Sequence, residues 1–180
     1  MKAIIMIIAL CGLYYGMNFY NLSEGAVRRM VQQNYMPSKE KVDTLCSFVK
    51  ANTKVKYTYK VNKDRDQVAS NSPTTICKYW QSYIPTKIDW QDVNINEVKV
   101  ERIQRFPYNE ATANISVRLS YQTTTKKKTK ESRTPVNVTE VIIIDRKEKV
   151  HYRRGFMGSY EYISLEGHDN VTRPEEKKRR

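Results

Sequence analysis

The chain is poor in the residues that most often build a catalytic centre. Its 180 residues include two histidines, three cysteines and six glycines. Neither His151 nor His168 has a second histidine or a cysteine at metal-ligand spacing, so the sequence predicts no metal site. It also lacks a glycine-rich phosphate loop, a nucleophile elbow and a paired-carboxylate pattern. We therefore expect no metal, no cofactor and no catalytic residue, and we interpret the chain as not an enzyme.

Acidic residues are scarce relative to basic ones. The chain has 32 Lys and Arg against 19 Asp and Glu, a formal net charge of +13. This excess of positive charge favours binding to polyanions such as nucleic acid, acidic lipid or an acidic envelope polymer, and it does not indicate which of them is bound. Local peaks of charge predict a solvated hairpin, with an anionic contact as the alternative. The candidate contact residues are Lys126, Lys127, Lys128, Lys130, Arg153 and Arg154.

The chain has only one long apolar run. Residues 3–20 follow a single Lys2, and no further charge appears before Glu24. A helix rises about 1.5 Å per residue, so about 20 residues cross the roughly 30 Å hydrocarbon core of a bilayer. The tyrosines at the end of the run suit the aromatic belt of a spanning helix. We predict that residues 1–21 form an N-terminal membrane anchor or signal segment.

Two other fates of this run stay open. It could be a cleaved signal peptide, for which Ala9-Leu10-Cys11 is the nearest match to a cleavage site, or a lipoprotein signal processed at Cys11. Lys2 favours an N-terminus inside the cell, whereas Arg28 and Arg29 lie close on the other side. We predict a single-pass membrane protein whose C-terminal domain is periplasmic, outside the cytoplasm. Secretion, or a lipid anchor after processing, is the alternative.

Three helices are predicted after the anchor. Apolar residues recur at helical spacing over residues 22–36 and 39–49, with Ser23 and Ser38 as caps. A third helix starts with Ser72 as its cap and Pro73 in its first turn. Between the second and third helices, residues 54–61 alternate as a half-buried strand, and residues 62–71 read as a polar loop.

The second half of the chain predicts strands. Strands are predicted near residues 98–101, 111–121, 136–144, 150–154 and 159–163; the first two alternate apolar and polar residues, and 136–144 is apolar on both faces, as in a central strand. Asp89 and Asp92, beside Trp90, are interpreted as turn residues, with a catalytic acid as the alternative, and Asp145 also as a turn residue. This order predicts an α+β fold, with three helices packed on a curved antiparallel sheet and one N-terminal transmembrane helix before them. The single domain would span residues 22–165, followed by a disordered basic tail at 166–180.

Cys46 and Cys77 lie on the apolar faces of the second and third predicted helices. In an oxidising compartment they could form a disulfide, which the chain-entropy relation values at about 3–4 kcal/mol for a loop of this length. Two buried free thiols are the alternative, because cysteine is often a small core residue.

The order of elements over residues 22–163 resembles the nuclear-transport-factor-two-like, cystatin-like cone superfamily. That superfamily includes pocket enzymes, such as dehydratases and ketosteroid isomerases, and non-catalytic domains. A short anchor before such a cone is similar to the membrane-tethered periplasmic subunits of bacterial conjugation and type IV secretion machines. The resemblance rests on element order alone, so it assigns no role to any residue.

The resemblance implies a non-catalytic, membrane-anchored extracytoplasmic domain that serves as an assembly subunit of an envelope-spanning secretion-like or conjugation-like complex. Its partners would be the membrane, through residues 3–20, other proteins of the complex, and other copies of itself. One alternative is a polyanion-binding module that uses the basic residues named above. A second is a small pocket enzyme, which a buried acidic residue inside a closed cone would favour.

Overall fold

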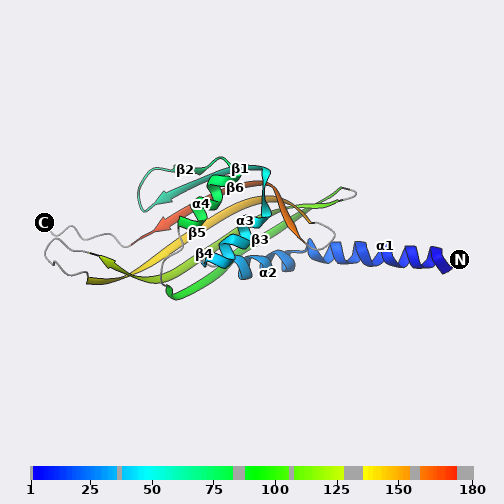
Figure 1. Ribbon diagram of the computed structural model, residues 1–180, viewed down its shortest axis with the longest axis horizontal. Helices are drawn as coiled ribbons and strands as arrows, with labels where there is room; N and C mark the ends of the chain where they lie inside the picture. The colour runs from blue at the N-terminus through cyan, green and yellow to red at the C-terminus, as the bar shows by residue number, and fades with distance from the viewer. Residues whose placement is uncertain are drawn as a thin grey trace.

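The computed structural model describes residues 2–35, 38–82, 88–105, 108–127, 136–154 and 159–173. These residues form four helices and six strands (Figure 1). In chain order the elements are α1 (Lys2–Asn21), α2 (Glu24–Asn34), α3 (Lys39–Phe48), β1 (Val49–Val61), β2 (Gln67–Ser70), α4 (Pro73–Ser82), β3 (Ile88–Arg105), β4 (Tyr108–Lys127), β5 (Val136–Arg154) and β6 (Tyr160–Thr172).

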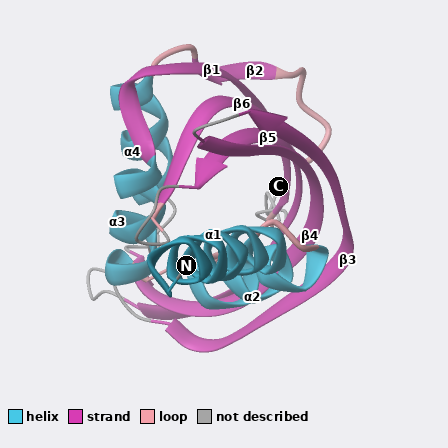
Figure 2. Ribbon diagram, turned by 90° about the vertical axis from the view of Figure 1, so that its right-hand side faces the viewer, coloured by secondary structure: helices cyan, strands magenta, loops and turns pink. Residues whose placement is uncertain are grey.

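One six-stranded sheet holds the molecule together, in the order β2-β1-β6-β5-β4-β3. It curls strongly around its concave side (Figure 2). The predicted α+β class with a curved sheet is therefore confirmed. The predicted all-antiparallel pairing is wrong at one place, because β1 and β6 run parallel from Lys54–Ser164 to Val61–Val171. A parallel pair needs a long connection, and here nearly the whole domain lies between the two strands.

Local sequence signals set the helix starts as predicted. The side chain of Ser23 accepts a hydrogen bond from the backbone N–H of Ala26, and Ser38 accepts one from Lys41. Pro73 is the first residue of α4. Helices α2, α3 and α4 each contact the sheet and bury their apolar faces there.

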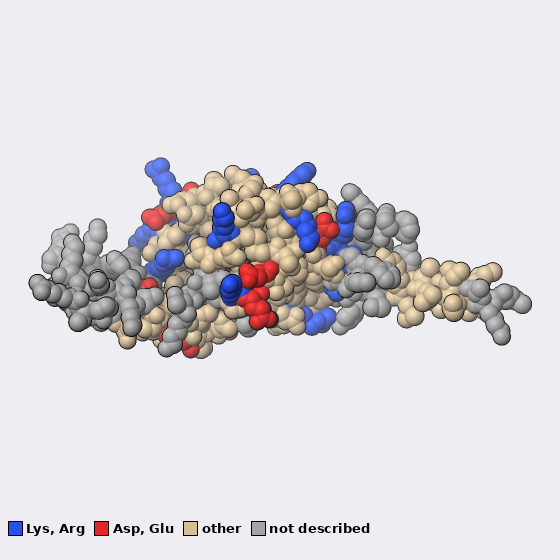
Figure 3. All heavy atoms as spheres, in the orientation of Figure 1, with Lys and Arg blue, Asp and Glu red and all other residues tan. Residues whose placement is uncertain are grey.

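Helix α1 differs from the other three because its aliphatic side chains face solvent. It projects from one end of the sheet (Figure 1), and the projection carries no charged side chain among its described residues (Figure 3). Its exposed large hydrophobic residues are Ile4, Ile5, Met6, Ile7, Ile8, Leu10 and Leu13. Among the residues that the structure describes, no helix is sufficiently long and apolar to cross a membrane. The transmembrane part of the predicted fold is therefore not confirmed.

The strands are longer than the sequence predicted. Asp89 and Asp92 lie within β3, and Asp145 lies within β5, so their interpretation as turn residues is wrong. Continuous pairing of β3 and β5 with β4 explains the difference, since polar residues alternate onto the outer face of the sheet. Arg118 of β4 forms an ion pair with Asp145 across this face, with Nε 2.7 Å from Oδ1. The short β2 also lies where a polar loop was predicted.

The sheet continues past residue 165, where the sequence predicted the end of the domain. Strand β6 reaches Thr172, and both Asp169 and Val171 are fully buried. His168 also belongs to this strand, and its Nδ1 lies 2.9 Å from the hydroxyl oxygen of Thr58. Residues 166–172 therefore belong to the domain rather than to a tail, and residues 174–180 lie outside the described part of the chain.

One glycine fixes the packing of β1 against β6. The ring of Tyr57 lies over Gly167, its partner in the parallel pair. A Cβ atom built on Gly167 would lie 2.1 Å from Cε2 of Tyr57, closer than any real contact. Because Tyr57 is fully buried, its ring has no room to move aside. Only glycine fits at position 167 with this ring in place.

We expect Gly167→Ala to destabilise the protein by about 1–3 kcal/mol, the usual cost of overpacking a dense core. Gly25→Ala is the matched control, because a Cβ there meets its nearest atom at 3.7 Å and lies in an exposed helix turn. That control should be neutral or stabilise by up to about 1 kcal/mol. Urea unfolding of both variants measures the difference, and equal stability of the two would contradict the packing argument.

Candidate functional site

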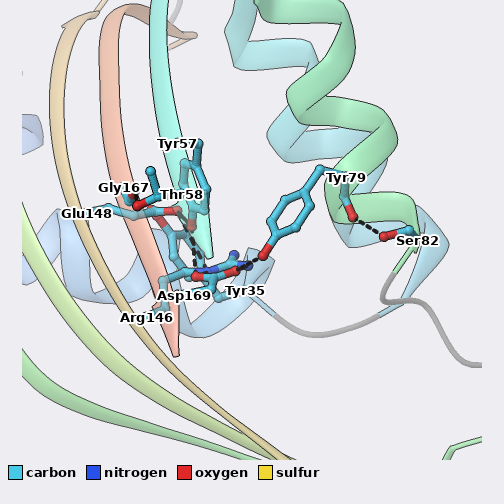
Figure 4. Close-up of polar contacts among 9 residues, drawn as sticks. All are labelled: Tyr35, Tyr57, Thr58, Tyr79, Ser82, Arg146, Glu148, Gly167 and Asp169. Atoms are coloured by element: carbon cyan, nitrogen blue, oxygen red, sulfur yellow. Dashed lines mark hydrogen bonds and ion pairs between the residues drawn. The ribbon is translucent and has the colours of Figure 1, made fainter. Parts of the chain in front are cut away.

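A cluster of polar side chains lies buried on the concave side of the sheet (Figure 4). Arg146 and Glu148 come from β5, Asp169 from β6, Tyr57 from β1, and Tyr35 from the residue after α2. All five are at most 6% exposed. Strand alternation explains their position, because positions 146 and 148 continue the inward face set by the buried isoleucines earlier in β5.

A paired arginine and aspartate form the centre of this cluster. Arg146 donates from Nε to Asp169 Oδ1 and from Nη2 to Asp169 Oδ2, both at 2.8 Å. This two-bond geometry is the strongest arrangement of a guanidinium and a carboxylate. Arg146 Nε also lies 3.8 Å from Glu148 Oε1. Its guanidinium carbon is 5.7 Å from the ring centroid of Tyr35 and 5.9 Å from that of Tyr57.

Tyrosines supply the remaining hydrogen bonds to the two acids. The hydroxyl of Tyr57 lies 2.8 Å from Glu148 Oε1 and 2.9 Å from Asp169 Oδ1. Tyr35 donates to Glu148 Oε2, and Tyr79 of α4 donates to Asp169 Oδ2 at 3.1 Å. Each carboxylate oxygen thus has a donor within reach. A buried polar network satisfied in this way holds its members rigidly in place.

Burial decides the protonation of the cluster. It raises the pKa of Glu148 above its ordinary value of 4.5, although the charge of Arg146 and the hydroxyl of Tyr35 act in the opposite direction. Burial likewise raises the pKa of Tyr35 and of Tyr57, so both phenols keep their protons. Burial lowers the pKa of Arg146, but electrostatic interactions with Asp169, Tyr57 and Glu148 and the hydrogen bond to Asp169 together outweigh it, and the net direction is upward. The arginine therefore stays charged.

We expect Asp169→Asn to destabilise the protein by about 3–5 kcal/mol. The substitution removes the carboxylate that Arg146 contacts through two hydrogen bonds and leaves the buried guanidinium with only the more distant Glu148, 3.8 Å away. Chemical denaturation at neutral pH measures the change in the free energy of unfolding. A loss below about 1 kcal/mol would show that Arg146 does not depend on Asp169.

Glu148→Gln is the matched control, since it changes the other acid of the same cluster into its amide. The pKa of Glu148 is raised by folding, so the folded state holds its proton more tightly and stability falls as the pH rises from about 4.5 through the folded pKa. An amide at this position cannot titrate, so the variant should lose this part of the pH dependence. Its unfolding free energy at low pH should stay within about 1 kcal/mol of the original.

A cleft of about 350 Å³ opens between α2 and the strand ends, outside the buried cluster. Its described lining residues are Ala26, Arg29, Met30, Gln33, Asn34, Phe48, Arg154 and Tyr160. A second hollow of about 450 Å³ lies on the outer face of the sheet, where Lys147, Lys149, Glu166 and His168 alternate outward.

No group of three or more His, Cys, Asp or Glu within the described ranges is arranged to hold a metal ion.

The structure separates the basic residues that the sequence grouped as an anionic contact. Lys126 pairs with Asn137 near the start of β5, whereas Arg153 and Arg154 end that strand. At about 3.3 Å per residue these positions lie roughly 55 Å apart along β5. Arg153 Nη2 donates to Glu110 Oε1 at 3.1 Å, and Arg154 contacts Tyr160.

The other lysines of this predicted contact are Lys127, Lys128 and Lys130. Lys127 ends β4 and pairs with Val136. Lys128 and Lys130 lie outside the described residues. His151 lies in β5, with its Nε2 3.2 Å from Glu110 Oε2.

The structure brings Cys46 of α3 and Cys77 of α4 together. Both thiols are free and half-buried. A hydrogen bond between the two side chains raises the pKa of Cys46 and lowers that of Cys77. Cys77 is therefore the thiol that loses its proton first and attacks an oxidant. The disulfide itself stays a prediction.

We expect Cys46 and Cys77 to be joined in protein isolated from an oxidising compartment. The Cys77 thiolate would attack a disulfide of an exchange partner, and Cys46 would then displace the partner, which leaves as a dithiol that carries the two protons lost by the cysteines. Alkylation during lysis, followed by mass measurement, should then label Cys11 alone, and all three cysteines after reduction. The Cys46→Ser variant should leave Cys77 open to alkylation. Labelling of all three without reduction would contradict the bridge.

Comparison with known proteins finds no matching protein family and no matching curated protein. Solved structures give fold-level matches. One is an NTF2-like protein of unknown function from Pseudomonas putida, with 10% identity and a TM-score of 0.42 over 86% of this chain and 89% of that chain. Another is a ketosteroid isomerase-like protein from Erwinia carotovora, with 13% identity and a TM-score of 0.35 over 80% and 94%.

A third is a candidate dehydratase of the NTF2-like family from Streptomyces avermitilis, with 8% identity and a TM-score of 0.39 over 79% of this chain and 92% of that chain. These neighbours agree with the resemblance to the cone superfamily and do not extend it to conjugation or secretion subunits. Because several carry enzyme names, our expectation that the chain is not an enzyme is overturned. At these scores they transfer no activity to this chain.

Proposed function

We propose that the chain is a membrane-anchored interaction domain, an assembly subunit of an envelope-spanning complex of the secretion or conjugation kind. In this proposal α1 inserts into the bilayer, and the cone on residues 22–173 lies outside the cytoplasm. Other proteins of the complex would contact the sheet and its rim.

The exposed aliphatic surface of α1 carries this proposal. Five consecutive residues, 4–8, are each at least 58% exposed. Since successive residues of a helix point about 100° apart, five in a row cover every side of it. A helix that is apolar all round is normally buried in a large core or in a membrane. Transfer of each such side chain out of water is worth about 1.5–3 kcal/mol, which favours insertion strongly.

Flotation with neutral phosphatidylcholine vesicles at high salt tests this anchor. We expect the full chain to float and to stay bound through carbonate washing, because apolar insertion does not depend on ionic strength. Ile8→Lys places a charge in α1 and should weaken partition by roughly 100-fold, from a cost of about 2.5–3.5 kcal/mol near a bilayer centre.

Val68→Lys is the matched control, because Val68 is 64% exposed against 65% for Ile8 and lies on β2, far from α1 in the fold. It should float like the unmodified chain. The proposal would be contradicted if the full chain stayed at the bottom of the gradient. It would also be contradicted if the Val68→Lys variant were released from the vesicles as readily as Ile8→Lys. A compartment-specific reporter fused after the last residue then reads the orientation.

A second candidate is a small-molecule reaction inside the cone, because two acids are buried there. Glu148 is fully enclosed, touches two phenols and has a raised pKa, so it can keep a proton at a pH where ordinary carboxyl groups have lost theirs. Infrared spectroscopy should show the C=O stretch of a protonated carboxyl that is absent from Glu148→Gln. Identical spectra across the pH range would remove this candidate.

The polyanion alternative needs the basic residues predicted for it to form one site, and those that the structure describes do not. The basic positions available for it lie at opposite ends of β5, and Arg153 is paired with Glu110. A shared anion would need these charges within a few ångströms of one another.

A further inference from the structure

The cleft beside α2 combines two guanidinium groups with an apolar wall. Arg29 of α2 and Arg154 at the end of β5 line it, together with Tyr160, Met30 and Phe48. No Asp or Glu is among the described residues that line this cleft. Its volume of about 350 Å³ lies within the usual range of small-ligand sites. The cleft thus suits a ligand with an anionic group beside an apolar part.

Tyr160 holds one of the two guanidinium groups in position. Arg154 Nη1 donates to the hydroxyl of Tyr160 at 2.7 Å, and its guanidinium carbon lies 4.6 Å from the ring centroid. Burial raises the pKa of Tyr160, while the charges of Arg154 and Arg29 act against this rise. Both positive charges are therefore near one phenol, whose own proton remains available to an acceptor. An arginine held as Arg154 is can bind phosphate oxygens with little loss of side-chain freedom.

The cleft lies at the end of the fold from which α1 projects. Strand β5 ends and β6 begins at that end (Figure 1). Arg29 follows Asn21, the last residue of α1, by eight residues, which is about 12 Å along a helical path. The headgroup layer of a bilayer extends about 5–8 Å beyond its hydrocarbon core. With α1 in a bilayer and Asn21 at the edge of its hydrocarbon core, Arg29 would lie a few ångströms outside the headgroup layer, so the cleft would be close to the bilayer surface.

We infer that this cleft binds the phosphodiester of an anionic phospholipid, between the guanidinium groups of Arg29 and Arg154. The hydroxyl of Tyr160 supplies a further donor, and Met30 and Phe48 contact the apolar part of the lipid. The inference rests on the proposed membrane anchor, because it needs α1 to bring the cleft to a bilayer surface. It adds a preference for lipid charge that α1, which has no charged residue after Lys2, cannot provide.

The test uses the full chain in a neutral detergent and two soluble lipids below their micelle concentration. Dihexanoyl phosphatidylglycerol should raise the midpoint of thermal unfolding, whereas dihexanoyl phosphatidylcholine should not. Arg29→Gln should weaken the apparent affinity for phosphatidylglycerol at least tenfold, the loss expected when one charge-assisted contact worth about 1.4 kcal/mol is removed.

Arg28→Gln is the matched control, because Arg28 is exposed on the same helix and does not line the cleft. It lowers the net charge equally and should change the affinity less than twofold. Equal losses in the two variants would mean diffuse attraction to the basic surface and would overturn the inference. So would the absence of any phosphatidylglycerol response, or an equally strong response to inorganic phosphate.

The two proposals fail separately. A chain that floats with neutral vesicles but does not respond to phosphatidylglycerol keeps the anchor and loses the headgroup site. A chain that responds to phosphatidylglycerol but does not float keeps the site and loses the anchor.

Discussion

The ion pair of Arg146 and Asp169 fixes how the parts of this fold meet. Asp169 joins β6 to β5 through Arg146 and to α4 through Tyr79, while Tyr57 of β1 reaches both acids. A buried charge without its partner costs several kcal/mol, so each of these elements is held where the pair requires it. Gly167 makes this possible, because only a residue without a Cβ lets the ring of Tyr57 lie flat over β6. The packing of the inner face of the sheet therefore depends both on the Arg146–Asp169 ion pair and on the close fit of Tyr57 against Gly167.

The sequence was most informative where a signal is local. Ser23, Ser38 and Pro73 mark helix starts, and each predicted start is confirmed within a residue or two, since capping depends on the nearest turn alone. The α+β class followed from the order of these elements. The parallel pairing of β1 with β6 could not be predicted in the same way, because it depends on contacts between residues about 110 positions apart.

The buried cluster was missed for a related reason. Arg146 and Glu148 stand in a run of charged residues, and charge ordinarily indicates an outer face. Their alternation with the inward isoleucines at 142 and 144 is the signal that would have found them, had β5 been read as one strand through Asp145. The sequence places Cys46 and Cys77 on the apolar stripes of their own helices, and their side chains are neighbours in the fold, while a bond between them stays a prediction. The convergence of Arg29 and Arg154 on Tyr160 could not be predicted from the sequence, since it needs the tertiary structure.

The pairing of β1 with β6 affects the order in which the chain folds during synthesis. The first strand of the sheet emerges from the ribosome long before the last, and its edge stays open until β6 has been synthesised. Arg146 has no aspartate to pair with, and Tyr57 lacks the second of its two acids, until Asp169 is synthesised near the C-terminus. Contacts this distant in sequence slow folding and prolong the exposure of apolar surface. Translation of nearly the whole chain therefore precedes closure of the core, which gives a chaperone or an export machine time to receive it unfolded.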